Sequence, residues 1–295
     1  MNRLPIEKRV QIVNLLVEGM SMRAICRVAD VSINTVTKLL EEVGTECSEY
    51  QDHVMRNLTI TNVQVDEIWA FIGAKQKNVP VDADPTLGLG DCYTFTAIDR
   101  DTKLMPCYML GYRTAECANQ FMADLASRLD CRVQLTTDAL KAYPEAVERA
   151  FGASVDYAVL NKTYEAGTMV VEAKRRYSPA VCVGATKNVV SGSPEIGMIS
   201  TSHVERANLT MRMGMRRFTR LTNGFSKKIE MHMHAVSLHF MHYHFARIHK
   251  TIKVAPAMQA GISDHLWSIE EIVRLVADPE AKKRGTYKPR ALKVA

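Results

Sequence analysis

The sequence lacks any long apolar run and any regular arrangement of cysteines. No stretch reaches the ~18 apolar residues that a membrane-spanning helix needs, and residues 1–9 do not form the apolar core of a signal peptide. The seven cysteines are scattered, odd in number and without a C-x-x-C pair. A disulfide framework and a zinc finger or ribbon are therefore not expected, and the pattern favours the reducing cytoplasm with no membrane partner.

The composition that is present is that of an ordinary globular protein with a modest excess of cations. Of 295 residues, 47% are apolar and 24% are charged, enough for one large domain or two to three smaller ones. Lys and Arg number 38 against 32 Asp and Glu, which gives a net charge of +6. Such an excess favours a polyanionic partner where the cations cluster.

Residues 1–46 carry the start and stop signals of three short helices. The expected helices cover residues 6–18, 22–28 and 33–43. Ser21 and Ser32 can cap the second and third helices, and Gly44 can end the third. Three short helices with a tight turn before the third form the helix-turn-helix pattern.

In such an arrangement the third helix would turn Asn34, Thr37 and Lys38 outward, where they could reach base edges and phosphates. The alternative is a helical bundle without a role in DNA binding. Residues 47–57 are polar and mixed, and we expect them to link this helical domain to the rest of the chain.

Residues 58–160 alternate between strand and helix patterns. The expected strands cover 58–71, 93–102, 103–111, 132–138 and 155–160, and the expected helices cover 115–129 and 143–151. Three strands followed by alternating helices and strands predict an α/β fold, with a mixed sheet flanked by helices.

Two acids occupy informative positions in this expected sheet. Asp66 lies within the first strand beside Glu67, and Asp138 ends the fourth strand. If the two strands are neighbours, the carboxylates of Asp66 and Asp138 can meet, and Glu205 could reach them from a covering helix. Oxygen ligands of this kind suit Mg²⁺ or Mn²⁺. The alternative for Asp66 and Glu67 is a salt bridge at the edge of the sheet.

Residues 203–228 combine one acid, Glu205, with many cations and an apolar stripe that suits a helix. The cations are Arg206, Arg212, Arg216, Arg217, Arg220, Lys227 and Lys228. On a helix, Asn208 and Arg212 share a side with Glu205. A metal-binding carboxylate flanked by phosphate-binding cations would have this pattern, although a surface helix with a spare glutamate is the alternative. His203 could assist as a ligand or proton shuttle, or simply pack the start of the helix.

Residues 229–249 are rich in histidine. The histidines are His232, His234, His239, His242, His244 and His249. They could bind a metal, but interleaved apolar residues favour a core helix. Beyond a short helix at 268–277, we expect residues 281–295 to be a disordered basic tail that adds non-specific affinity for DNA.

The motifs in this order resemble the DDE transposases of the insertion-sequence-one family. They are the helix-turn-helix pattern, then Val65-Asp-Glu-Ile-Trp69, Thr137-Asp-Ala-Leu-Lys-Ala-Tyr143, and Val204-Glu-Arg-Ala-Asn-Leu209 with Phe225-Ser-Lys. The resemblance covers roughly residues 5–260. It implies an RNase H-like catalytic fold in which Asp66, Asp138 and Glu205 hold two Mg²⁺ or Mn²⁺ ions, and in which Arg212 contacts donor DNA.

Two departures from the family pattern are visible. The long interval between Asp138 and Glu205 makes residues 161–200 an apparent insertion, and the helical domain lacks zinc-binding cysteines, so no structural zinc is expected there. We therefore expect a catalytic domain over 58–262 and a short helix with a basic tail over 263–295.

The resulting hypothesis is a cytoplasmic, nucleoid-associated DNA transposase. It would bind element ends through the helix-turn-helix, cleave and join DNA by in-line displacement at phosphorus, and act as a homo-oligomer on DNA. Arg206, Arg212, Arg216 and Lys227 would contact backbone phosphates. The alternatives are a DNA-binding regulator with an inactive RNase H-like remnant and a structure-selective nuclease of the same fold.

Overall fold

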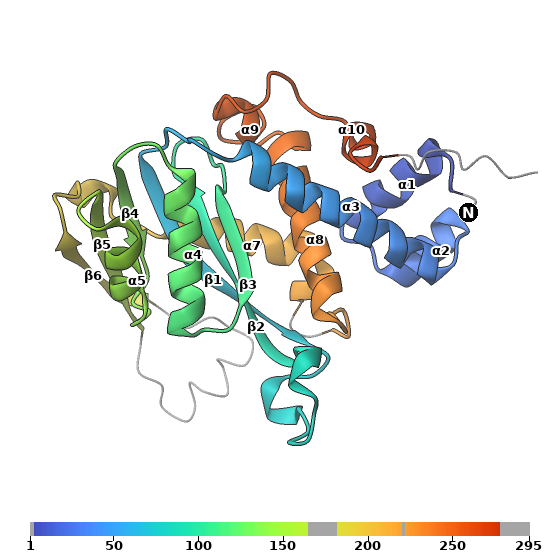
Figure 1. The fold of residues 1–295 in the computed structure, drawn as a ribbon, viewed down its shortest axis with the longest axis horizontal. Coiled ribbons are helices and arrows are strands. Elements are labelled where there is room, and N and C mark those ends of the chain that lie inside the picture. The colour runs from blue at the N-terminus through green and yellow to red at the C-terminus, as the bar shows by residue number, and fades with distance from the viewer. Residues whose placement is uncertain (1–2, 165–181, 220–221, 278–295) are drawn as a thin grey trace, which may run out of the picture.

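The computed structural model describes residues 3–164, 182–219 and 222–277. A six-stranded sheet covered by helices adjoins a group of N-terminal helices (Figure 1). The expected basic tail at 281–295 lies outside the described residues, and so does the middle of the expected insertion, 165–181.

The sheet has the strand order β3-β2-β1-β4-β5-β6. The strands are β1 (Asn62–Ile72), β2 (Gly90–Asp99), β3 (Cys107–Gly111), β4 (Val133–Thr137), β5 (Val155–Tyr164) and β6 (Cys182–Ser191). The first three strands form an antiparallel meander, β4 and β5 run parallel to β1, and β6 is antiparallel to β5. The predicted α/β class, an RNase H-like mixed sheet flanked by helices, is therefore confirmed.

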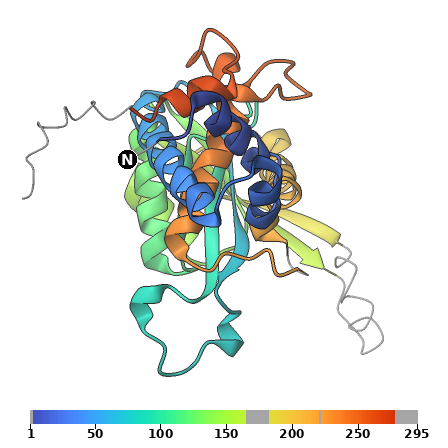
Figure 2. The same cartoon turned by 90° about the vertical axis from the view of Figure 1, so that its right-hand side faces the viewer.

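The central strand β1 separates two apolar layers. The covering helices are α4 (Ala115–Arg128), α5 (Tyr143–Phe151), α7 (Ser202–Gly214) and α8 (Ile229–Met241). Val63 and Val65 of β1 belong to the core that includes α4 and α5, whereas Ile68 and Ala70 belong to the core that includes α7 and α8. This alternation follows from the two-residue period of a strand, and a second view shows helices on both sides of the sheet (Figure 2).

Of the three N-terminal helices, the second and third begin where their capping residues predict. The three helices are α1 (Ile6–Val17), α2 (Met22–Ala29) and α3 (Ile33–Val54). The Ser21 side chain accepts the Ala24 N–H at 3.3 Å, and the Ser32 side chain accepts the Thr35 N–H at 3.2 Å. Each cap satisfies a backbone donor that the first turn of a helix leaves without a partner.

The expected end of the third helix at Gly44 is wrong, because α3 continues to Val54. Gly44 lies where α3 crosses α8, and a Cβ at this position would lie 2.5 Å from the Cβ of His234. The glycine thus permits close helix packing instead of ending the helix. Most of the expected linker at 47–57 is consequently helical, and Gln51 within it is buried. The division into domains stays a prediction.

One apolar core joins the N-terminal helices to the sheet. It includes Ile12 and Leu40 of these helices, Phe95 and Leu135 of the sheet, and Ile272 near the C-terminal end of the described chain. Because burial of apolar surface is the dominant favourable term in folding, these parts stabilise one another.

The other elements include β6, a π-helical turn at His242–Ala246, α9 (Pro256–Gln259) and α10 (Ile269–Arg274). β5 extends to Tyr164 and pairs with β6, so the two ends of the expected insertion at 161–200 form an edge ribbon of the sheet. No helix in the described ranges is both long and apolar enough to cross a bilayer.

The histidine-rich segment is a core helix, which is the interpretation that the sequence favoured over a metal site. His232, His239 and His244 are buried. His244 Nδ1 lies 3.1 Å from Gln51 Oε1, while its Nε2 accepts the Met105 N–H at 3.2 Å, so the neutral ring joins α3 to the connection between β2 and β3. Within the described residues these histidines are not part of any group placed to hold a metal ion.

Candidate active site

Three acids converge at the centre of the sheet. Asp66 and Glu67 are successive residues of β1, so their Cβ atoms point to opposite faces of the sheet although their carboxylates approach each other. Asp138 directly follows β4, whose last residue, Thr137, pairs with Val65 in parallel register. Asp138 thus emerges beside β1, and one carboxylate oxygen from each of the three acids lies within 4.8 Å of the others.

The crowding of these carboxylates disfavours their charged forms. Burial raises the pKa of Asp66 to about 6, and the nearby charge of Asp138 acts in the same direction. Burial also raises the pKa of Glu67 to about 7, again with help from Asp138. Carboxylates that share a site repel one another unless a cation compensates them.

The donor set of this cluster fits a divalent cation. Its contacting atoms are carboxylate oxygens, which Mg²⁺ and Mn²⁺ prefer. In the part of the chain that the structure describes, Asp66, Glu67 and Asp138 are the group of such side chains close enough to share an ion. The structure thus brings together the sequence-predicted Asp66 and Asp138.

Glu205 is near this cluster but is not part of it. It lies in the first turn of α7, and its Oε1 accepts hydrogen bonds from Lys162 Nζ and, at 2.5 Å, from Thr201 Oγ1. Its charge makes the smallest of the contributions that raise the pKa of Asp66. The structure does not bring Glu205 to the other two predicted ligands, and its role as third ligand stays a prediction.

Asn208 and His203 occupy different surroundings on α7. The buried Asn208 donates from Nδ2 to Asp66 Oδ2 at 2.9 Å and accepts from Thr96 Oγ1 at 3.1 Å. It therefore fixes the Asp66 carboxylate. His203 lies with Nδ1 3.3 Å from Lys103 Nζ, and burial, followed by the charge of Lys103, lowers its pKa.

The start of α7 is fixed by β1 itself. The buried Gln64 side chain accepts the backbone N–H groups of His203 at 2.8 Å and of Val204 at 3.3 Å. These donors are among those that a helix leaves unsatisfied at its first turn. β1 therefore positions both Asp66 and the helix that carries Asn208 and Glu205.

Sequence reasoning missed a second network on the other face of β1. The Glu67 side chain is only 3% exposed. Its Oε1 accepts the hydroxyl of Tyr143, and its Oε2 lies 3.4 Å from Nε of Arg113. Arg113 also places Nη2 3.5 Å from Asp138 Oδ2. The apolar surroundings of Glu67 were a signal of function, but no local pattern points to Arg113.

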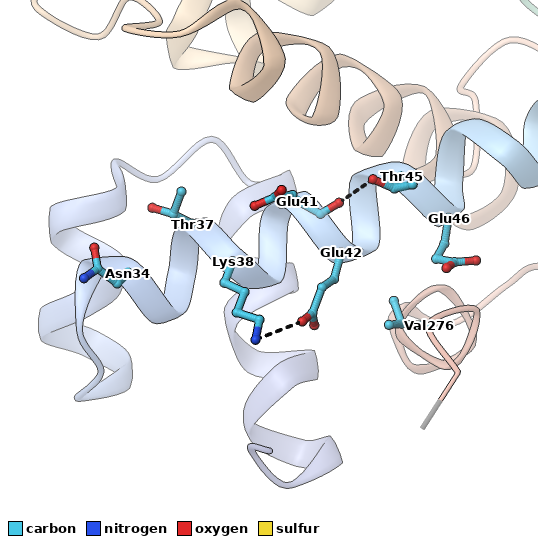
Figure 3. A pocket seen from close by; sticks show the side chains of 8 residues that line it. All are labelled: Asn34, Thr37, Lys38, Glu41, Glu42, Thr45, Glu46 and Val276. Carbon is cyan, nitrogen blue, oxygen red and sulfur yellow. Dashed lines mark hydrogen bonds and ion pairs between the residues drawn. The ribbon is translucent and has the colours of Figure 1, made fainter. Parts of the chain in front are cut away.

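The candidate base-reading residues lie on an exposed part of α3 (Figure 3). Asn34, Thr37 and Lys38 line an open groove of about 620 Å³. Thr37 Oγ1 donates to a backbone carbonyl of its own helix, and Lys38 Nζ lies 3.7 Å from Glu42. The other lining residues are Glu41, Glu42, Thr45, Glu46 and Val276. A DNA backbone could therefore approach the first turns of α3 more readily than the acidic turns that follow.

The cations of the 203–228 stretch divide into exposed and buried groups. Arg206, Arg216 and Lys227 are exposed, and Arg212 is half-buried. Arg217 instead lies mostly inside, where Nη1 donates to Ser226 Oγ at 3.0 Å and burial lowers its pKa to about 10. The exposed cations are available for phosphate contacts, while Arg220 lies outside the described residues.

Comparison with known proteins gives structural matches but no sequence match. No family model and no curated protein matches the chain. The chain is similar to a piggyBac transposase synaptic complex with hairpin DNA over 92% of its own length and 69% of that chain, with 10% identity and a TM-score of 0.41.

Two further matches are Mos1 transposase complexes. The paired-end complex with the left transposon end matches 54% of this chain and 60% of that chain at 16% identity, with a TM-score of 0.24. The strand transfer complex matches 81% and 78% at 14% identity, again with a TM-score of 0.24. The identities and TM-scores are low, so the function is argued from this chain's own residues. Membership of the insertion-sequence-one family stays a prediction.

Proposed function

We propose that this protein is a DNA transposase whose acidic cluster cleaves and joins phosphodiester bonds. The observation that carries the proposal is the convergence of Asp66 and Asp138 carboxylate oxygens within 4.8 Å at the centre of a mixed sheet. Ordinary structural acids are costly at such a partly buried position unless a partner compensates them. The exposed cations that follow on α7 and beyond would bind the DNA backbone.

Each residue has a distinct part in this chemistry. Asp66 and Asp138 would hold the ions, with Glu205 as the proposed third ligand. When bound, two Mg²⁺ or Mn²⁺ ions would supply activation of the attacking oxygen and stabilisation of the leaving oxygen. Asn208 keeps the Asp66 carboxylate oriented through its 2.9 Å hydrogen bond. Arg206, Arg212, Arg216 and Lys227 would hold phosphates on either side of the reacting bond.

The N-terminal helices would supply recognition of the element ends. Asn34, Thr37 and Lys38 are accessible on α3, as a helix-turn-helix reader requires. The proposed domain division is a reader at 1–46, a catalytic domain at 58–262 and a C-terminal segment at 263–295. Pairing of two ends implies at least a homodimer on DNA, in the manner of the insertion-sequence-one family.

The test is metal-dependent nicking and strand transfer on DNA from the flanks of the gene. We expect activity with Mn²⁺ in the natural protein and none in Asp138→Asn. The matched control is Asp130→Asn, which changes an exposed acid outside the cluster and should stay active. Retention of cleavage by Asp138→Asn, or cleavage in the presence of EDTA, would contradict the proposal.

A DNA-binding regulator with an inactive catalytic remnant is the second candidate. The observation that favours it is the engagement of Glu205 by Lys162 and Thr201, away from the acidic cluster. Binding of element ends without cleavage, in both the natural protein and Asp138→Asn, would support this alternative. Asp66→Ala separates the two activities as well, because it should abolish joining and spare end binding.

A further inference from the structure

We propose that Arg113 is a phosphate-binding residue for the DNA substrate, held in place by Glu67 and Tyr143. The inference rests on the proposed function, since it assigns a substrate contact to the same site. Arg113 lies immediately before the cap of α4, in the connection that follows β3. Its side chain is 44% exposed, yet it contacts two acids of the cluster.

The two contacts fix the guanidinium at the rim of the site. Its Nε lies 3.4 Å from Glu67 Oε2, and its Nη2 lies 3.5 Å from Asp138 Oδ2. Arginine has five N–H donors in a rigid plane, so this use of two nitrogens leaves others for a ligand. A planar fork of this kind matches the geometry of phosphate oxygens.

Glu67 is built as an anchor. It is nearly inaccessible to solvent, and it contacts α5 through Tyr143. Tyr143, completely buried in the first turn of α5, donates its hydroxyl to Glu67. The carboxylate that holds Arg113 is therefore itself held by a second element of the fold.

Stability alone does not account for this arrangement. A half-exposed ion pair adds little to folding, and burial of a carboxylate costs more than such a pair returns. The cost is understandable if the position of Arg113 matters for the reaction. A phosphodiester that reacts beside Asp138 would lie next to this guanidinium, which would stabilise the charge that develops on the phosphoryl oxygens.

The experiment combines DNA binding with kinetics. Binding of an element-end duplex is measured by fluorescence anisotropy across a salt series, and nicking with Mn²⁺ is measured on the same duplex. Arg113→Ala should reduce the slope of log Kd against log salt by about one phosphate contact. It should also lower kcat about 100-fold or more. Arg113→Lys should recover binding but not the rate, because a lysine lacks the planar fork.

Tyr143→Phe tests the positioning part of the proposal. It removes only the hydroxyl that holds Glu67, so we expect the salt slope and KM to stay unchanged while kcat falls roughly tenfold. Arg149→Ala is the matched control, because this exposed arginine of α5 pairs with Glu145 away from the cluster. It should behave as the natural protein does.

Two outcomes would overturn the inference. One is an unchanged salt slope and rate in Arg113→Ala. The other is a pair of results: Glu67→Gln loses affinity for Mn²⁺, measured by calorimetry, and Arg113→Ala binds DNA as the natural protein does. Together they would make Glu67 a metal ligand instead of a residue that holds Arg113. If the proposed function itself is wrong, the experiment gives a different result. The natural protein would then bind the duplex without cleaving it, and the salt slope of Arg113→Ala would still report the phosphate contact.

Discussion

Substitution of Gly44 by alanine should destabilise the protein by opposing the close approach of α3 and α8. The added Cβ would lie 2.5 Å from the Cβ of His234, 2.7 Å from its Cα and 2.7 Å from its carbonyl oxygen. Ordinary van der Waals contacts begin at 3.4 Å. Because two of these atoms belong to the backbone of α8, no side-chain rotation relieves the clash, and the helices must separate.

The magnitude follows from two opposing terms. Overpacking of a tight core costs about 1–3 kcal/mol, and a contact with backbone belongs at the upper end of this range. Alanine in a helix interior is more stabilising than glycine by roughly 0.5–1 kcal/mol. The free energy of unfolding should therefore fall by about 2 kcal/mol. The same separation should disturb the Gln51 hydrogen bonds to His244 and to the Ser237 carbonyl, which join these helices.

Urea unfolding followed by circular dichroism measures this effect as a shift of the midpoint at constant slope. Thr45→Ala is the control, since Thr45 is the next residue of α3 and is exposed. It should be neutral or slightly stabilising, because alanine is the better helix former. A Gly44→Ala variant at least as stable as the natural protein would refute the reasoning, since helix propensity alone would then decide the outcome.

Three further predictions concern protonation, metal and the third acid. Burial lowers the pKa of His244 to about 3, so near pH 6.5 only the unfolded chain takes up a proton on this residue. The contribution of His244 to the free energy of unfolding should therefore be fully present above this pH and fall by about 2 kcal/mol between pH 7.5 and 5. The pH dependence of the urea midpoint should therefore be shallower in His244→Gln, and equal slopes would contradict the assignment. Mn²⁺ at 100 times its Kd should stabilise the folded protein by about 2.7 kcal/mol and so raise its Tm, and EDTA should reverse the rise. The same shift of Tm in Asp138→Asn would argue against the site. Glu205→Gln should lower the nicking rate at least 100-fold and change the stability by less than about 1 kcal/mol, because its pair with Lys162 is partly exposed; full nicking activity would assign the third ligand to another residue.

Elements specified by local signals were predictable from the sequence. Ser21 and Ser32 marked the starts of α2 and α3, and the strand and helix patterns from β1 to β5 had the right order. The approach of Asp66 and Asp138 followed from topology, because the parallel strands that precede them are neighbours. The interpretation of the histidine-rich segment as a core helix depended on interleaved apolar residues and was confirmed.

The positions that the sequence predicted wrongly or missed carry no local signal of their role in the folded protein. Gly44 carries the local signal of a helix end, but its role depends on His234, which lies on another helix. β6 is exposed along almost its whole length and lacks the apolar alternation of a half-buried strand. Arg113 belongs to no motif, and only the fold brings it to Glu67 and Asp138. Such positions require the three-dimensional arrangement.

The continuity of α3 has a geometric consequence for the reaction. This helix has 22 residues and so spans about 33 Å without a joint. If its first turns read the element end, the helix acts as a ruler that fixes the interval between the recognised bases and the cleaved bond. Insertion of a single base pair into that interval should therefore shift the nick by one nucleotide relative to the end of the element, instead of being absorbed by a flexible connection.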